Sequence, residues 1–197
     1  MPDKPDLAAL IGSRICHDLI SPIGAISNGV ELLAMDGATK GPELSLISES
    51  VSNANARIRL FRIAFGSTGG DSRIARGEVI TILADITRGS RLRIDWTSPT
   101  DLSRRDVKLA FLAIQCMESA MPWGGQISVA NTDHWTVSGE AHRLRIEPAL
   151  WDALTDPKAE VEITPAMVHF ALLADEILRQ KGSLTVDRGV TALRIAF

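Results

Sequence analysis

The stretch Arg14-Ile15-Cys16-His17-Asp18-Leu19-Ile20-Ser21-Pro22 decides the fold, because it lies inside a long segment with a helical pattern. On a helix of about 100° per residue, the apolar residues between about 7 and 35 fall in one stripe roughly 120° wide. This stripe, typical of a helix that faces a core, consists of Ile11, Ile15, Leu19, Ile23, Ile26, Val30 and Leu33. His17 lies about 180° from its centre, so we expect the imidazole to point into solvent.

Pro22 stands inside the same segment, one turn after His17. Its ring removes the hydrogen bond to the carbonyl of Asp18 and clashes with it, at a cost of about 3 kcal/mol. We therefore expect the helix to bend there. A single exposed histidine is usually a spectator, but His-Asp followed by Pro on a long amphipathic helix is a more specific combination.

The composition is typical of a globular protein and does not indicate one that binds nucleic acid. Of the 197 residues, 45% are hydrophobic and 23% are charged, and the net charge of −3 does not suit a nucleic-acid-binding protein. Cys16 and Cys116 lack metal-ligand spacing, which favours a reduced chain. No signal peptide or membrane span is apparent, so we expect a cytoplasmic protein that binds neither membranes nor nucleic acids.

A second helix is predicted over about 44–65, where apolar residues recur at alternating spacings of three and four. They are Leu44, Ile47, Val51, Ala54, Ile58, Phe61 and Phe65. A short turn at 37–42, with Gly37 as a helix cap, predicts an antiparallel hairpin. Because two such helices cannot bury both stripes alone, we expect a second copy to complete a dimeric four-helix bundle. The alternative is that the hairpin packs on the rest of its own chain.

After a break at 66–71 the pattern becomes mixed. Helices are predicted at 78–88, 103–122 and 164–180, and strands at 91–96, 126–130, 142–146, 183–187 and 191–197. Ser103 and Asp106 resemble a capping box, Gly124-Gly125 turns the chain, and Thr164-Pro165 opens the last helix. We predict an α+β protein of two domains: a hairpin over 1–68 and an α/β sandwich over 72–197, with helices on one face of a mixed sheet.

The His17-Asp18 pair with Pro22 resembles the H-box of sensor histidine kinases and, more closely, that of the histidine phosphotransferases built like them. The order of elements after residue 70 resembles the kinases' ATP-binding domain. However, Gln115 and Ser119 stand where active kinases carry two asparagines, and the stretches 131–135 and 152–164 contain no glycine. Nucleotide cradles need the backbone N–H groups that glycines expose. The chain is therefore similar to the bacterial histidine phosphotransferases of the ChpT type, which keep the histidine and have a degenerate ATP-binding domain.

This resemblance implies a role in a phosphorelay. His17 would accept a phosphoryl group from a receiver-domain aspartate of a hybrid histidine kinase and pass it to response-regulator receivers. It also implies a homodimer that binds no cofactor of its own, with Mg²⁺ supplied by the partner receiver. A neutral ring nitrogen of histidine is nucleophilic near pH 7, which suits this chemistry. The alternatives are an active sensor histidine kinase fragment and a non-catalytic dimeric scaffold for receivers.

Three neighbours of His17 are candidates for supporting roles, each with a plainer alternative. Asp18 could orient the ring or tune its proton affinity, or it could be a charge on the helix surface. Arg14 could contact the phosphoryl group, or it could be solvated. Ser21 could donate a hydrogen bond near the site, or simply occupy a helical position.

Leu10, Ile20 and Gly24 flank His17 outside the apolar stripe. Small and apolar residues there would admit a helix of a receiver domain, although scattered exposed apolar side chains are also common.

The other histidines lack a second ligand at metal spacing, so structural or surface roles are expected for His134, His142 and His169 and no metal site is predicted. The four tryptophans are too scattered for a nucleic-acid stacking platform.

Overall fold

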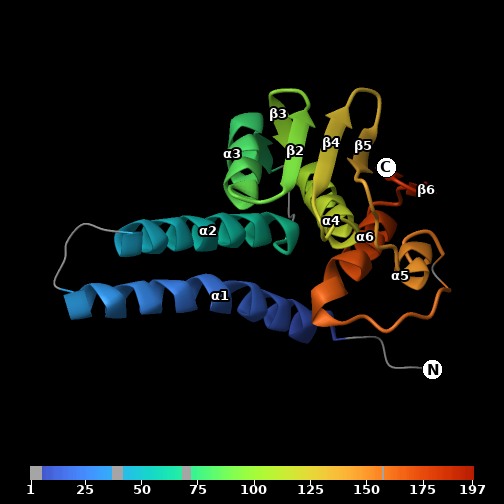
Figure 1. The fold of residues 1–197 in the computed structure, drawn as a ribbon. Helices are drawn as coiled ribbons and strands as arrows, with labels where there is room; N and C mark the ends of the chain where they lie inside the picture. Colours follow the sequence, from blue (N-terminus) through green and yellow to red (C-terminus); the bar gives the residue numbers. More distant parts are fainter. Residues whose placement is uncertain (1–5, 37–41, 68–71, 157) are drawn as a thin grey trace.

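A computed structural model of the chain describes residues 6–36, 42–67, 72–156 and 158–197. The chain folds into a long helical hairpin with an α/β part packed along one side of it (Figure 1). Residues 37–41 of the turn predicted at 37–42, with its cap Gly37, and residues 68–71 of the predicted break lie outside the described residues.

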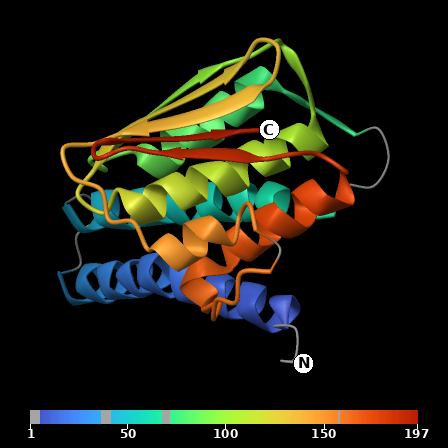
Figure 2. The ribbon, with the colours of Figure 1, turned by 90° about the vertical axis from the view of Figure 1, so that its right-hand side faces the viewer.

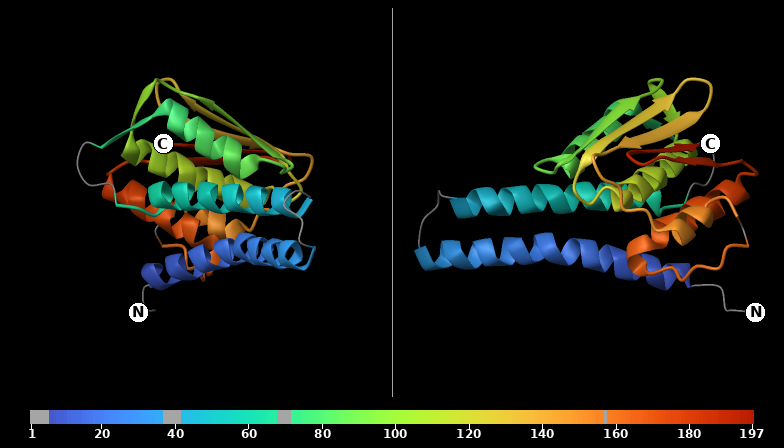
Figure 3. Two further views of the ribbon diagram at one scale, coloured as in Figure 1. Left: turned by 90° about the vertical axis from the view of Figure 1, so that its left-hand side faces the viewer. Right: turned by 45° about the vertical axis from the view of Figure 1, so that its right-hand side comes forward.

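The hairpin consists of α1 (Leu7–Asp36) and α2 (Pro42–Ala64), which pack against each other as predicted. Gly29 is buried at their contact, where a Cβ atom would lie 2.5 Å from Cγ1 of Ile47, so this glycine lets the two helices approach closely. Helix α1 continues through Pro22. Its axis curves along its length (Figures 1 and 3), in line with the bend expected of a helix with a proline inside it. Among the helices of the described residues, none combines the length and the hydrophobicity that a membrane span needs.

Each predicted apolar stripe of the hairpin is only partly covered in the single chain. Ala54 and Phe61 of α2 are buried, whereas side chains seven residues apart on its other flank are 40–49% exposed: Leu44, Val51 and Ile58. On α1, Ile23 and Val30 are 57% and 53% exposed, although both belong to the stripe expected to face a core. The loop-side half of the hairpin projects beyond the α/β part (Figure 3), so that part of both helices is covered only by the other helix of the hairpin.

The rest of the chain forms a five-stranded mixed sheet with helices on one face. The strands follow the order β2-β4-β5-β7-β6, in which β2 and β4 are parallel and all other neighbours are antiparallel. Their bounds are β2 Leu92–Thr97, β4 Gly125–Asn131, β5 Trp135–Glu140, β6 Thr185–Arg188 and β7 Ala192–Ala196. The helices are α3 Arg76–Thr87, α4 Arg104–Ala120, α5 Pro148–Asp152 and α6 Val168–Arg179, the last preceded by the 3₁₀ turn η1 Pro165–Met167. This arrangement confirms the predicted α/β sandwich.

The core lies between the sheet and its helices. Inward-facing strand residues such as Ile127, Val137 and Ile195 are fully buried in one core with α4, most of whose residues are buried. Figure 2 shows the resulting layers, with the sheet outermost, α3, α4 and α6 beneath it, and α1 on the far side. Helix α2 packs on α3 and α4, while α1 contacts α6 and η1. The helix that carries His17 is therefore supported by its own hairpin and by the α/β part.

Several local predictions were wrong or incomplete. The strand expected at 142–146 is absent: the strand lies earlier, at Trp135–Glu140, and the N–H of Arg145 bonds to the carbonyl of Ala120 at the end of α4. The polar-apolar alternation arises because Leu144 and Ile146 pack on the core from an irregular segment. Ser103 precedes α4 but makes no side-chain cap hydrogen bond. The sequence patterns also missed α5 and the short antiparallel pair β1 (Arg73–Ala75) and β3 (Asp101–Ser103).

Candidate functional site

His17 lies on the outer face of α1, with its side chain 85% exposed. The predicted exposure is therefore confirmed. Its Nδ1 atom lies 3.1 Å from Oδ1 of Asp18, the next residue along the helix. The ring is thus accessible to a partner and is in hydrogen-bond contact with a carboxylate.

This contact determines which ring nitrogen is free. An ionised carboxylate only accepts hydrogen bonds, so the contact requires a proton on Nδ1 of His17. In the neutral ring the other nitrogen, Nε2, then carries the lone pair. The nitrogen that points away from Asp18 is consequently the nucleophilic one.

Asp18 itself is held by two arginines. Its side chain is only 9% exposed, and its Oδ2 atom accepts hydrogen bonds from Nε of Arg14 at 2.8 Å and from Nη1 of Arg57 at 3.4 Å. One oxygen of the carboxylate thus faces His17 while the other faces two guanidinium groups. Asp18 is therefore a largely buried, hydrogen-bonded carboxylate and not a solvated surface charge. Arg14 is hydrogen-bonded to it, one turn before the histidine.

The same charged group extends into the α/β part of the molecule. Arg14 also donates from Nη1 to the carbonyl of Ala166 in η1. Glu118 of α4 lies within reach of these charges: burial raises its pKa, and the charges of Arg57 and Arg14 lower it while Asp18 raises it further. The polar groups connected to Asp18 and Arg14 therefore come from α1, α2, α4 and η1.

His169 of α6 also borders this group. It is 1% exposed, and neither ring nitrogen has a hydrogen-bond partner within the described ranges. Burial lowers its pKa to about 3, with a further decrease from the charge of Arg14 that Asp18 partly offsets. Its ring is packed at 4.9 Å from the ring of Phe170. His169 is thus a neutral core residue, in line with the structural role expected for it.

The predicted docking residues around His17 differ in how exposed they are. Ile20 is 68% exposed, and Gly24 is exposed with open space where a Cβ atom would stand, since no atom beyond its chain neighbours and the adjacent backbone of α1 lies within 4 Å of that point. Leu10 is half-buried, and Ser21 is exposed. An apolar side chain and an open backbone position therefore lie within two turns of the histidine.

Gln115 and Ser119, the two α4 residues matched in sequence to the asparagines of active kinases, each donate a hydrogen bond within their own helix, and Oε1 of Gln115 is buried without a partner among the described residues. Nε2 of Gln115 donates to the carbonyl of Phe111, and the hydroxyl of Ser119 donates to the carbonyl of Cys116. Across the described parts of the chain, no three His, Cys, Asp or Glu side chains gather as metal ligands do.

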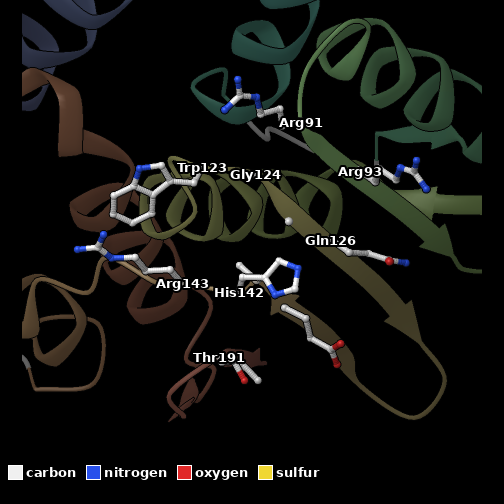
Figure 4. A pocket seen from close by; sticks show the side chains of 12 residues that line it. Arg91, Arg93, Trp123, Gly124, Gln126, His142, Arg143 and Thr191 are labelled. Carbon is white, nitrogen blue, oxygen red and sulfur yellow. The ribbon is translucent and has the colours of Figure 1, made fainter.

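A hollow lies at one end of the sheet, on the face opposite the helices (Figure 4). It has a volume of about 920 Å³ and is bordered by Arg91, Arg93 and Arg143. The guanidinium of Arg143 stacks 4.4 Å from the ring of Trp123. In Figure 4 the three guanidinium groups point in different directions and do not converge on one point. The hollow therefore does not form the convergent cradle that a phosphate group requires.

Arg57 is the site residue that the sequence analysis missed, because it stands 39 residues from Asp18. A signal was present in the predicted hairpin, since antiparallel helices joined by a short turn bring such distant positions opposite each other. The contact could have been located by pairing residues across the turn.

The comparisons with known proteins agree on one family. Residues 76–191 match the model of the histidine phosphotransferase C-terminal domain. The chain is 31% identical to the protein phosphotransferase ChpT of Brucella abortus (strain 2308), with 98% of this chain and 94% of that protein covered. A bacterial phosphotransferase solved at 1.7 Å superposes with a TM-score of 0.81 at 28% identity, over 100% of this chain and 97% of that one.

Proposed function

The chain belongs to the histidine phosphotransferases of the ChpT type, and on this basis we propose that His17 is the phosphoacceptor of a bacterial phosphorelay. The proposed donor is a phosphorylated receiver-domain aspartate of a hybrid histidine kinase, and the proposed acceptors are receivers of response regulators. The observation that carries the proposal is the exposure of His17 together with the hydrogen bond that leaves Nε2 free.

The chemistry consists of two reversible displacements. Nε2 attacks the phosphorus of the aspartyl phosphate, the N–P bond forms, and the O–P bond to the receiver breaks as the aspartate leaves as a carboxylate. In the second step the aspartate of another receiver attacks the phosphohistidine, and the N–P bond breaks. The charge that appears on the phosphorylated ring is stabilised by the Asp18 carboxylate at Nδ1.

The surface around His17 supports receiver docking. We propose that Leu10, Ile20 and Gly24 accept a helix of the receiver, because an exposed apolar side chain and an open glycine lie within two turns of the reacting nitrogen. The partly uncovered stripes of α1 and α2 support a homodimer in which two hairpins form a four-helix bundle. In this arrangement residues 1–68 carry dimerisation and transfer, and residues 72–197 support them.

We further propose that the α/β part does not bind ATP and that any Mg²⁺ comes from the receiver. The side chains of Gln115 and Ser119 are bonded within α4, and the segment between α5 and η1 contains no glycine that could expose its backbone to phosphates. Since its partners are the cytoplasmic receivers, we expect the protein to act in the cytoplasm.

The proposal predicts that His17→Ala abolishes transfer. A phosphorylated receiver labelled with ³²P is mixed with the wild type, with His17→Ala, and with His134→Ala, which alters an exposed histidine in the β4–β5 turn. Label should move to the wild type and to His134→Ala but not to His17→Ala, because the latter has no nucleophile at the site.

The same assay separates the alternatives. Equal transfer to wild type and His17→Ala would contradict the proposal. Label on His17 from [γ-³²P]ATP in the absence of a receiver would favour an active kinase fragment. Receiver binding without transfer to any variant would favour a non-catalytic scaffold.

A further inference from the structure

Arg57 joins the two helices of the hairpin at the carboxylate beside His17. Its Nη1 lies 3.4 Å from Oδ2 of Asp18, while its Nε donates to Oδ1 of Asn53 at 3.1 Å, one turn earlier in α2. Asn53 thereby directs the guanidinium toward α1. The side chain of Arg57 remains 40% exposed, so part of it is open to solvent.

The two oxygens of the Asp18 carboxylate contact different residues. His17 lies at Oδ1, on a side chain that is 85% exposed and contacts little else that could hold it in place. The arginines lie at Oδ2. A carboxylate held at one oxygen presents the other at a fixed place, so the ring orientation of His17 depends on what binds Oδ2.

Arg14 and Arg57 differ in what else they do. Arg14 lies on the same helix as Asp18 and shares its guanidinium with the carbonyl of Ala166 in η1. Arg57 comes from the other helix of the hairpin and, after burial, its charge has the largest effect on the pKa of Glu118, which it lowers. Arg57 therefore contacts the carboxylate of Asp18 on α1 and lowers the pKa of Glu118 on α4.

We infer that Arg57 is a positioning residue for phosphotransfer: through Asp18 it keeps the His17 ring oriented with Nε2 toward the receiver. This inference rests on the proposed function. In the proposed transfer reaction, Arg57 does not touch the phosphoryl group. Its effect appears in the rate of the transfer step and not in the binding of the receiver.

The test compares Arg57→Met with Arg59→Met. Arg59 lies two residues further along α2 and pairs with Asp85 at 3.6 Å, away from Asp18, so it is a matched control for loss of an α2 arginine. Transfer from a phosphorylated receiver is measured over a range of receiver concentrations. We expect Arg57→Met to lower kcat by between about three- and tenfold with KM unchanged, and Arg59→Met to behave as the wild type.

Three further measurements test the inference independently of folding. Arg57→Lys retains the positive charge near Glu118 but lacks the planar fork, so it should fold as the wild type and fall between wild type and Arg57→Met in kcat. In an Asp18→Asn background, Arg57→Met should cause no further decrease, because both act on the same carboxylate. ¹⁵N NMR of the His17 ring should show a smaller Nδ1–H fraction in Arg57→Met.

Three outcomes would overturn the inference: kcat for Arg57→Met equal to that of Arg59→Met, an effect on KM alone, or an equal additional loss in the Asp18→Asn background. If His17→Ala abolishes transfer while any of these occurs, only the role of Arg57 fails. If His17→Ala transfers as the wild type does, the proposed function itself fails.

Discussion

His169 shows at the scale of one residue how the surroundings of the site shape stability. Because its folded-state pKa is about 3 and the ordinary value for histidine is 6.5, the unfolded chain binds a proton between these pH values that the folded chain does not. Its contribution to the free energy of unfolding is therefore fully present above about pH 6.5 and decreases as the pH falls toward about 3.

This shift predicts a pH-dependent loss of stability. Between pH 7 and pH 5, exclusion of the His169 proton should lower the free energy of unfolding by about 2 kcal/mol. His169→Leu should remove most of that decrease, whatever its effect at pH 7, whereas His134→Leu at an exposed position should not. Urea unfolding at several pH values measures it, and an unchanged slope in His169→Leu would contradict the assignment.

At the scale of elements, a buried ion pair connects two helices of the α/β part. Nζ of Lys108 in α4 lies 3.0 Å from Oε2 of Glu176 in α6 and donates to the carbonyl of Gly66 after α2. Burial alone would raise the pKa of Glu176, but hydrogen bonds from Lys108 and Gln180 and nearby positive charges outweigh it, so the pKa is lowered. Three segments of the chain thus meet at one ammonium group.

Breaking this pair should be costly. Lys108→Met leaves Glu176 buried without its partner and should lower the free energy of unfolding by about 3 kcal/mol. The double variant Lys108→Met/Glu176→Leu should recover much of this loss, because neither charge is then left buried and unpaired. Urea unfolding of both variants and of the wild type provides the comparison. A double variant no more stable than Lys108→Met would show that apolar contacts cannot replace the pair.

At the scale of the whole molecule, the uncovered flanks of the hairpin predict a dimer. Leu44, Val51 and Ile58 repeat at the seven-residue interval of a coiled-coil seam, and all three are at least 40% exposed in the single chain. A second hairpin related by twofold symmetry would bury them against each other.

Light scattering should therefore give about twice the mass of one chain at micromolar concentration. Val51→Glu combined with Ile58→Glu should shift the protein to the monomer, because each substitution places a charge in the apolar seam. Val190→Glu, at a position 91% exposed, is the matched control and should remain dimeric. A monomeric wild type would contradict the bundle.

The amino-acid pattern alone determined the two long helices and the outward direction of His17. Helical periodicity is local, so the angle between His17 and the stripe of Ile15 and Leu19 can be calculated from spacing only. The strands that alternate cleanly in the sheet were found in the same way, as at β2 and β4.

Only the tertiary structure decided the contacts between segments distant in the chain. Residues 142–146 alternate as a strand does, yet the hydrogen bonds of a sheet depend on neighbours, and β5 instead occupies the place between β4 and β7. The contact of Arg57 with Asp18 and the burial of His169 likewise depend on how α1, α2 and α6 meet. Spacing reports the face on which a side chain lies, whereas the packing of elements decides what that face touches.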